Sequence, residues 1–216
     1  MSEFGTLQLE FRYLDQAVQS SETKRFRKRV EGIFELLSEV SPANGLFPTY
    51  MRHSKTASAT SAKATSPSRK STATATTASS STDHDTSRPH FSSDHLTFGA
   101  LADSFYEYML KIWLQGGKLE PMYREMYDKA MQGMHDELLH ISTPSGLTYL
   151  ADKVGGKQIH HKMDHLVCFV GGMLALGAYT DPLGLESERA QRDLQTAKVS
   201  VHKLAQLSFL LVLVRA

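Results

Sequence analysis

The chain has 216 residues, 41% of them hydrophobic, which is enough for one sizeable core or part of a larger one. With 24 basic and 23 acidic residues the formal net charge is +1, so nothing indicates a nucleic-acid surface or a polybasic membrane patch. The single cysteine, Cys168, excludes a disulfide within the chain, and the longest apolar run, residues 207–214, is too short to cross a bilayer, which needs about 20 residues.

The first 52 residues show helical periodicity. Apolar residues at intervals of four and three predict a helix over residues 6–19 with one buried face. That face consists of Leu7, Phe11, Leu14 and Val18. A second helix is expected to start at a cap formed by Ser20 or Ser21 and to end before residues 41–48, which contain two prolines, an asparagine and a glycine.

An abrupt change of composition follows. Residues 53–90 contain no phenylalanine, tyrosine or tryptophan and almost no large aliphatic side chain. Such a segment buries too little apolar surface to offset the entropy of ordering, so we predict a low-complexity, disordered insertion over residues 53–93. Helical periodicity resumes in the same style afterwards. This indicates an insertion into one domain, with flanking segments 1–52 and 94–198, rather than a linker between two domains.

The rest of the chain predicts four further helices and a short β-hairpin. The helices are expected at residues 97–115, 120–141, 164–178 and 186–204. Between the second and third of these, Gly155 and Gly156 separate two short segments of strand character and predict the turn of a hairpin. Helices in sequential pairs with short connections indicate an all-α array in which neighbours pack antiparallel.

Acidic residues in the helix predicted at 97–115 are candidates for a catalytic or ligand-binding site. Asp103, Tyr106 and Glu107 share a face. The predicted buried stripe of the same helix is Leu101, Phe105, Tyr108 and Ile112. The simple interpretation is a solvated acid pair. The alternative is a sugar site, because aromatic side chains crowd around the acids, and sugars are bound by flat apolar rings together with hydrogen-bond acceptors.

Two other places carry polar side chains of interest. Residues 159–169 contain His160, His161 and His165, and the last two have helical spacing for metal ligands. No HExxH pattern is present, so structural histidines are favoured over a metal site. Glu10 stands among apolar residues, which indicates either an ion pair with a basic group or a functional role.

Four sequence blocks carry a family resemblance. In chain order they are LQLEFRYL, LADSFYEYMLKIWLQGGK, GLTYLADKVGG and HKMDHLVCFVGGMLALGAY. Together they resemble the class I α-1,2-mannosidases of glycoside hydrolase family 47. The resemblance implies an all-α fold that is part of an (α/α)7 barrel, Ca2+ as cofactor, and inverting hydrolysis of α-1,2-linked mannose in high-mannose N-glycans.

The resemblance also implies roles for individual residues. Asp103 matches an active-site aspartate of the family and is the predicted catalytic residue. Glu10 and His165 match residues of the substrate pocket. Leu101 stands where endoplasmic-reticulum-type members have arginine, so it is expected at the substrate-binding surface and indicates the broader branch preference of Golgi-type members. Cys168 matches a cysteine whose partner in the family is absent here.

The chain also departs from the family pattern. The two other active-site acids and the threonine that ligates Ca2+ have no counterpart in it, so no metal ligand is predicted, and residues 199–216 form an atypical tail. We therefore expect a mannosyl-oligosaccharide α-1,2-mannosidase of N-glycan processing, incomplete and without turnover as this chain, in the Golgi or endoplasmic reticulum. No membrane segment is visible, although full-length members are often membrane-anchored. The alternative is a non-catalytic relative that binds mannose glycans in glycoprotein quality control.

Overall fold

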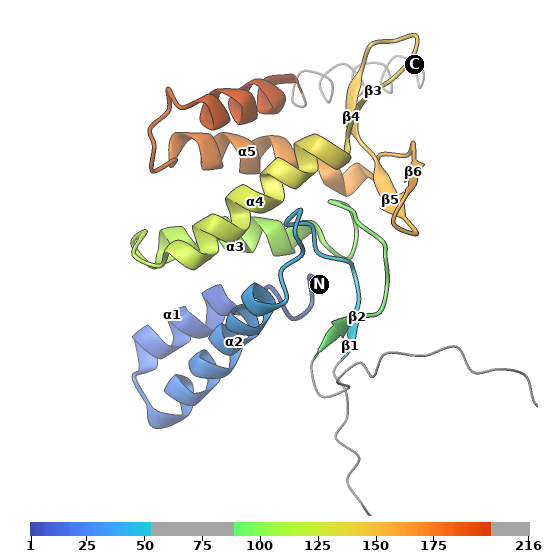
Figure 1. Cartoon of the computed structure of the whole chain (residues 1–216). Coiled ribbons are helices and arrows are strands. Elements are labelled where there is room, and N and C mark those ends of the chain that lie inside the picture. The colour runs from blue at the N-terminus through green and yellow to red at the C-terminus, as the bar shows by residue number, and fades with distance from the viewer. Residues whose placement is uncertain (53–88, 200–216) are drawn as a thin grey trace, which may run out of the picture.

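The computed structural model describes residues 1–52 and 89–199, and Figure 1 shows their arrangement. Most of the insertion predicted at 53–93 and of the tail predicted at 199–216 lies outside the described residues. The described part is mainly helical, as predicted, and its helical hairpins stand side by side. These are α1 (Gln8–Val18) with α2 (Ser21–Glu39), α3 (Asp103–Gln115) with α4 (Pro121–Glu137), and α5 (Val170–Tyr179) with a helix at 188–199.

Short antiparallel strand pairs lie on one side of the helices (Figure 1). They are β1 (Met51–Arg52) with β2 (His90–Phe91), β3 (Leu139–Ile141) with β4 (Thr148–Leu150), and β5 (Asp152–Val154) with β6 (Gln158–His160). The β5–β6 turn is the predicted pair Gly155 and Gly156, whose φ angles of 61° and 72° are open to glycine without steric cost. The predicted hairpin is thus confirmed, whereas the other two strand pairs were not predicted.

Several predicted helix boundaries are wrong. The helix expected from residue 97 begins only at Asp103, after a turn. The helix expected to run to residue 141 ends at Glu137, because its last residues pair with β4 as strand β3. The helix expected from residue 164 begins as a 3-10 helix, η1 (His165–Phe169), before α5. Helical periodicity does not reveal partners elsewhere in the chain that compete for backbone hydrogen bonds.

The predicted buried face of α1 is also wrong. Leu7, Leu14 and Val18 expose 38%, 39% and 56% of their surface. The face that α1 buries is polar instead, and it consists of Gln8, Arg12 and Asp15.

Each of these polar side chains is buried with a partner. The Gln8 amide donates to the Val30 carbonyl at 3.0 Å. The Arg12 guanidinium pairs with Glu31 at 2.9 Å and with Glu120 at 2.6 Å. Buried polar groups persist where they are hydrogen-bonded, and here those bonds join α1 to α2 and to the connection between α3 and α4.

The cap predicted for α2 is formed by Ser20. Its hydroxyl accepts from the Thr23 N–H at 3.1 Å, while the Thr23 hydroxyl accepts from the Ser20 N–H at 3.1 Å, which makes a capping box. Ser20→Ala is expected to lower the free energy of unfolding by about 1 kcal/mol in urea unfolding. Ser38→Ala is the matched control, because the Ser38 hydroxyl bonds only the Glu35 carbonyl in the last turns of the same helix. Equal losses in the two variants would refute the capping role.

The core gathers around α3. Its buried residues are Phe105, Tyr106, Met109, Leu110, Ile112 and Trp113. The predicted buried stripe is wrong in two places. Leu101, which was expected to be buried, is 41% exposed. Tyr106, which was expected on the acidic face, is fully buried, and its hydroxyl accepts a hydrogen bond from the Phe47 N–H at 3.0 Å. Because α3 packs against both α1 and α4, it buries a wide arc and leaves only a narrow polar one. That arc carries Asp103, Ser104, Glu107 and Lys111.

Candidate functional site

Asp103 is the first residue of α3, and the turn before it sets where the helix starts. The Asp103 N–H donates to the Gly99 carbonyl at 2.9 Å. Leu101 has a φ of 79°, which is uncommon for a residue with a side chain and occurs preferentially at functional sites. The Asp103 carboxylate is partly exposed and accepts a long hydrogen bond of 3.4 Å from Ser104.

Glu107 differs from Asp103 in that it forms an ion pair. Its carboxylate pairs with Lys111 at 2.6 Å, one turn further along α3. For Glu107 the simple interpretation of a solvated, paired acid therefore holds, and Asp103 is the acid of this face that remains a candidate for chemistry.

Glu10 reaches α3 from α1. The Tyr108 hydroxyl donates to the Glu10 carboxylate at 2.7 Å. Burial, together with this carboxylate, raises the pKa of Tyr108 to about 12, so the phenol stays protonated and keeps donating. Tyr108 lies five residues after Asp103, which is about 7.5 Å along a helix. The sequence interpretation assigned Tyr108 to the buried stripe and missed this contact, for which the sequence holds no local signal.

His165 lies at the start of η1 and is exposed. The preceding Asp164 carboxylate accepts from the Leu166 N–H at 3.0 Å, and this bond and one from the Ala100 N–H lower the pKa of Asp164. A Cβ placed on Gly99 would lie 2.7 Å from the Asp164 Cβ, so only glycine allows so close an approach. The loop that carries His165 is thereby held against the turn before Asp103.

The predicted site residues lie along the first half of α3 and beside the turn before it. Asp103 begins α3 and Leu101 lies in the turn before it, Glu10 is bonded to the middle of the helix through Tyr108, and His165 follows the loop that packs on Gly99. Their roles as catalytic or substrate-binding residues stay predictions.

The described residues contain no cluster of candidate metal-binding side chains. Within residues 1–52 and 89–199, no three histidine, cysteine, aspartate or glutamate side chains gather as a metal would require. The Ca2+ that the resemblance implies stays a prediction. In the same part of the chain, no helix is both long and apolar enough to cross a membrane.

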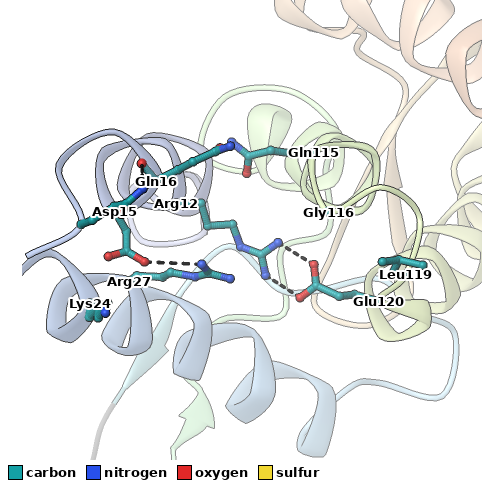
Figure 2. Close-up of a pocket in the computed structure, with 10 residues that line it drawn as sticks. Arg12, Asp15, Gln16, Lys24, Arg27, Gln115, Gly116, Leu119 and Glu120 are labelled. Atoms are coloured by element: carbon teal, nitrogen blue, oxygen red, sulfur yellow. Dashed lines mark hydrogen bonds and ion pairs between the residues drawn. The ribbon is translucent and has the colours of Figure 1, made fainter.

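A polar groove of about 480 Å³ lies at the opposite end of α3, where Gln115 and Gly116 line it (Figure 2). Figure 2 shows Arg12 directed at Glu120 and Arg27 directed at Asp15. Arg12 binds both Glu120 oxygens, at 2.6 and 2.7 Å, and Arg27 meets Asp15 at 3.4 Å. Because these charges are paired within the chain, we interpret the groove as structural.

Comparison with known proteins identifies the family of this chain. Residues 1–208 match the family model of glycosyl hydrolase family 47, and the chain belongs to this family. It is 37% identical over 180 residues to mannosyl-oligosaccharide alpha-1,2-mannosidase IA of Drosophila melanogaster, covering 83% of this chain and 21% of the relative. It is 47% identical over 100 residues to the endoplasmic reticulum mannosyl-oligosaccharide 1,2-alpha-mannosidase of Homo sapiens, covering 46% of this chain and 14% of the relative.

A solved structure supports the fold. The alpha-1,2-mannosidase from Trichoderma reesei superposes with a TM-score of 0.61 at 20% sequence identity, covering 92% of this chain and 33% of that one. At this identity the likeness concerns the fold alone. The chain spans about a fifth of the length of the Drosophila relative and a third of the solved one.

Proposed function

We propose that this chain is part of a mannosyl-oligosaccharide α-1,2-mannosidase and contributes one side of its glycan site. The observation that carries the proposal is the family match over residues 1–208, with relatives that bear this name. The placement of three residues supports it: Asp103 begins α3, Glu10 is bonded to Tyr108 in the middle of α3, and His165 follows the loop that packs on Gly99. Polar groups contributed by separate elements are typical of a binding site.

The chemistry of each residue suits a neutral sugar. Asp103 offers a charged, partly exposed acceptor for a hydroxyl or for the proton of a reacting group. Glu10 is oriented by the Tyr108 hydroxyl and keeps a second carboxylate oxygen for a sugar hydroxyl. Inversion at a glycosidic bond needs an acid and a base about 6.5–9.5 Å apart with water between them. In our proposal Asp103 is one such carboxyl group.

We also propose a substrate, a cellular setting and a branch preference. The substrate is a high-mannose N-glycan, and the setting is the Golgi or endoplasmic reticulum; a relative named for the endoplasmic reticulum supports that setting. Leu101 lacks the guanidinium fork that would clamp sugar hydroxyls, so we propose that several branches are accepted. A complete (α/α)7 barrel and its Ca2+ would involve groups other than the described ones.

The proposal is tested by binding of α-1,2-mannobiose to the 216-residue chain, measured by calorimetry in the presence of Ca2+. Asp103→Asn is expected to weaken binding about 10- to 100-fold, since hydrogen bonds to a charged group contribute about 1.5–3 kcal/mol. The matched control is Glu107→Gln, one turn along the same arc and paired with Lys111, which should bind as the parent does.

Equal affinities of the two variants would refute the assignment of Asp103. Release of mannose from the disaccharide, lost in Asp103→Asn, would show that the chain by itself is a hydrolase. Binding without release is the result expected of a chain that contributes only one side of the glycan site.

A further inference from the structure

A second cluster of polar and aromatic side chains lies outside the residues assigned above. It forms where the β3–β4 hairpin meets the segment that leads from β6 to η1. The Tyr149 hydroxyl and the His161 Nδ1 are 2.7 Å apart. The His140 ring stands edge-on to the His161 ring, with 5.6 Å between centroids, and is the cross-strand neighbour of Tyr149.

Tyr149 and His161 border a hollow of about 490 Å³. It is lined by Ile141, Ser142, Thr143, Tyr149 and His161. No aspartate, glutamate, lysine or arginine is among these lining residues, so the hollow offers no fixed charge to an ionic ligand. It presents hydroxyl groups and an imidazole beside an apolar side chain, Ile141, which is 70% exposed. This mixture suits a neutral, polyhydroxylated ligand, whose C–H faces need apolar contact and whose hydroxyls need donors and acceptors.

The cluster has hydrogen-bonding capacity left over. His140 Nε2 is buried and has no hydrogen-bond partner among the described residues. Buried polar atoms without a partner are rare in folded proteins. Tyr149 and His161 satisfy each other through one atom each, so the second His161 ring nitrogen remains for a ligand.

The cluster lies beside the proposed glycan site. Residues 161–164 form neither helix nor strand and lead directly to His165. Because a chain of four residues spans at most about 14 Å, the Cα atoms of His161 and His165 are no further apart than that. Along this segment Asp164 packs on Gly99, just before Asp103. The backbone of Leu96, further upstream, exchanges two hydrogen bonds with Lys153 in β5. Figure 1 shows both hairpins on the same side of the helices.

From this placement we propose that Tyr149 and His161 form a second sugar subsite, which holds a neutral sugar of another branch of the oligosaccharide whose end lies at Asp103. The inference rests on the proposed function, since it takes the ligand to be a branched glycan. It adds a specificity-determining contact that depends on the β3–β4 hairpin.

The test compares α-1,2-mannobiose with a branched high-mannose oligosaccharide, both titrated into the 216-residue chain and followed by calorimetry and by the imidazole proton resonances of His161. His161→Ala and Tyr149→Phe are expected to weaken binding of the branched oligosaccharide about 3- to 10-fold, because a hydrogen bond contributes about 0.5–1.5 kcal/mol. Binding of the disaccharide should not change. Tyr179→Phe, at a tyrosine on α5 that is 68% exposed, is the matched control.

The outcomes separate this inference from the proposed function. In one outcome, disaccharide binding depends on Asp103, but the parent chain and His161→Ala bind the branched oligosaccharide equally well. That outcome would overturn the second subsite and leave the proposed function standing. The opposite result is a shift of the His161 resonances on adding the branched oligosaccharide, seen in both the parent chain and Asp103→Asn, while the parent chain binds no disaccharide. That result would support the subsite and overturn the assignment at Asp103. Absence of any glycan binding would overturn both.

Discussion

Replacing Arg124 with methionine is expected to lower the free energy of unfolding by about 3 kcal/mol, because it leaves buried carboxylates with less compensation. The Arg124 side chain is 6% exposed, and it pairs with Asp181 at 3.1 Å and with Asp128 at 2.8 Å. Its guanidinium carbon also lies 5.2 Å from the centre of the Trp113 ring. Methionine keeps much of the apolar volume, so the loss reports mainly on charge and hydrogen bonds.

The arrangement of the partners explains why the loss is not larger. The Asp181 side chain is 1% exposed. Burial alone would raise the pKa of Asp181, but the hydrogen bonds from Arg189 and the Leu183 N–H and the charge of Arg124 hold it below its usual range. Arg189 also pairs with Asp181, at 2.6 Å, and this pair does not involve Arg124. The network joins α4 to the turn after α5, so its loss should loosen the third helical hairpin first.

Chemical unfolding followed by circular dichroism measures this effect. Arg25→Met is the matched control, because Arg25 pairs with Glu22 at 3.9 Å with both side chains more than half exposed. Such surface pairs contribute about 0–1 kcal/mol. If the two arginine variants unfold at the same urea concentration, the Arg124 network is not a main contributor to stability.

Phe105→Ala is expected to cost about 4 kcal/mol, since removal of a buried aromatic ring loses its transfer free energy and leaves a cavity. Phe105 is fully buried. Its ring centre lies 5.6 Å from that of Phe34 in α2 and 5.2 Å from that of Phe47 in the connection after α2. One side chain thus joins the first helical hairpin to α3. It is two residues from Asp103, so the same packing holds the start of α3 in place.

Phe105→Leu is the matched variant, because it keeps most of the volume and should cost only about 1 kcal/mol. The two variants are compared by urea unfolding under identical conditions. If the loss comes from the cavity, the alanine variant should have a clearly lower free energy of unfolding than the leucine variant. Similar losses for alanine and leucine would mean that aromatic geometry, rather than filled volume, is what stabilises this junction.

Local patterns in the sequence determined much of the secondary structure. Helical periodicity located α2 and α4, and the Ser20 cap marks the start of α2, because these signals depend on residues within one or two turns. The Gly155 and Gly156 pair predicted the β5–β6 turn because its positive φ angles favour glycine. The four ordered blocks indicated the family that the comparison confirms.

Only the tertiary structure decided which face of a helix is buried and which side chains meet. The apolar stripe of α1 predicted the wrong face, because Gln8 and Arg12 have partners in α2 and near α4 that lie far away in sequence. The contact between Glu10 and Tyr108 joins residues 98 apart, and no local pattern encodes it. Burial and pairing depend on which elements come together, so the geometry around Asp103 emerges only when α1, α3 and the loop before η1 are packed.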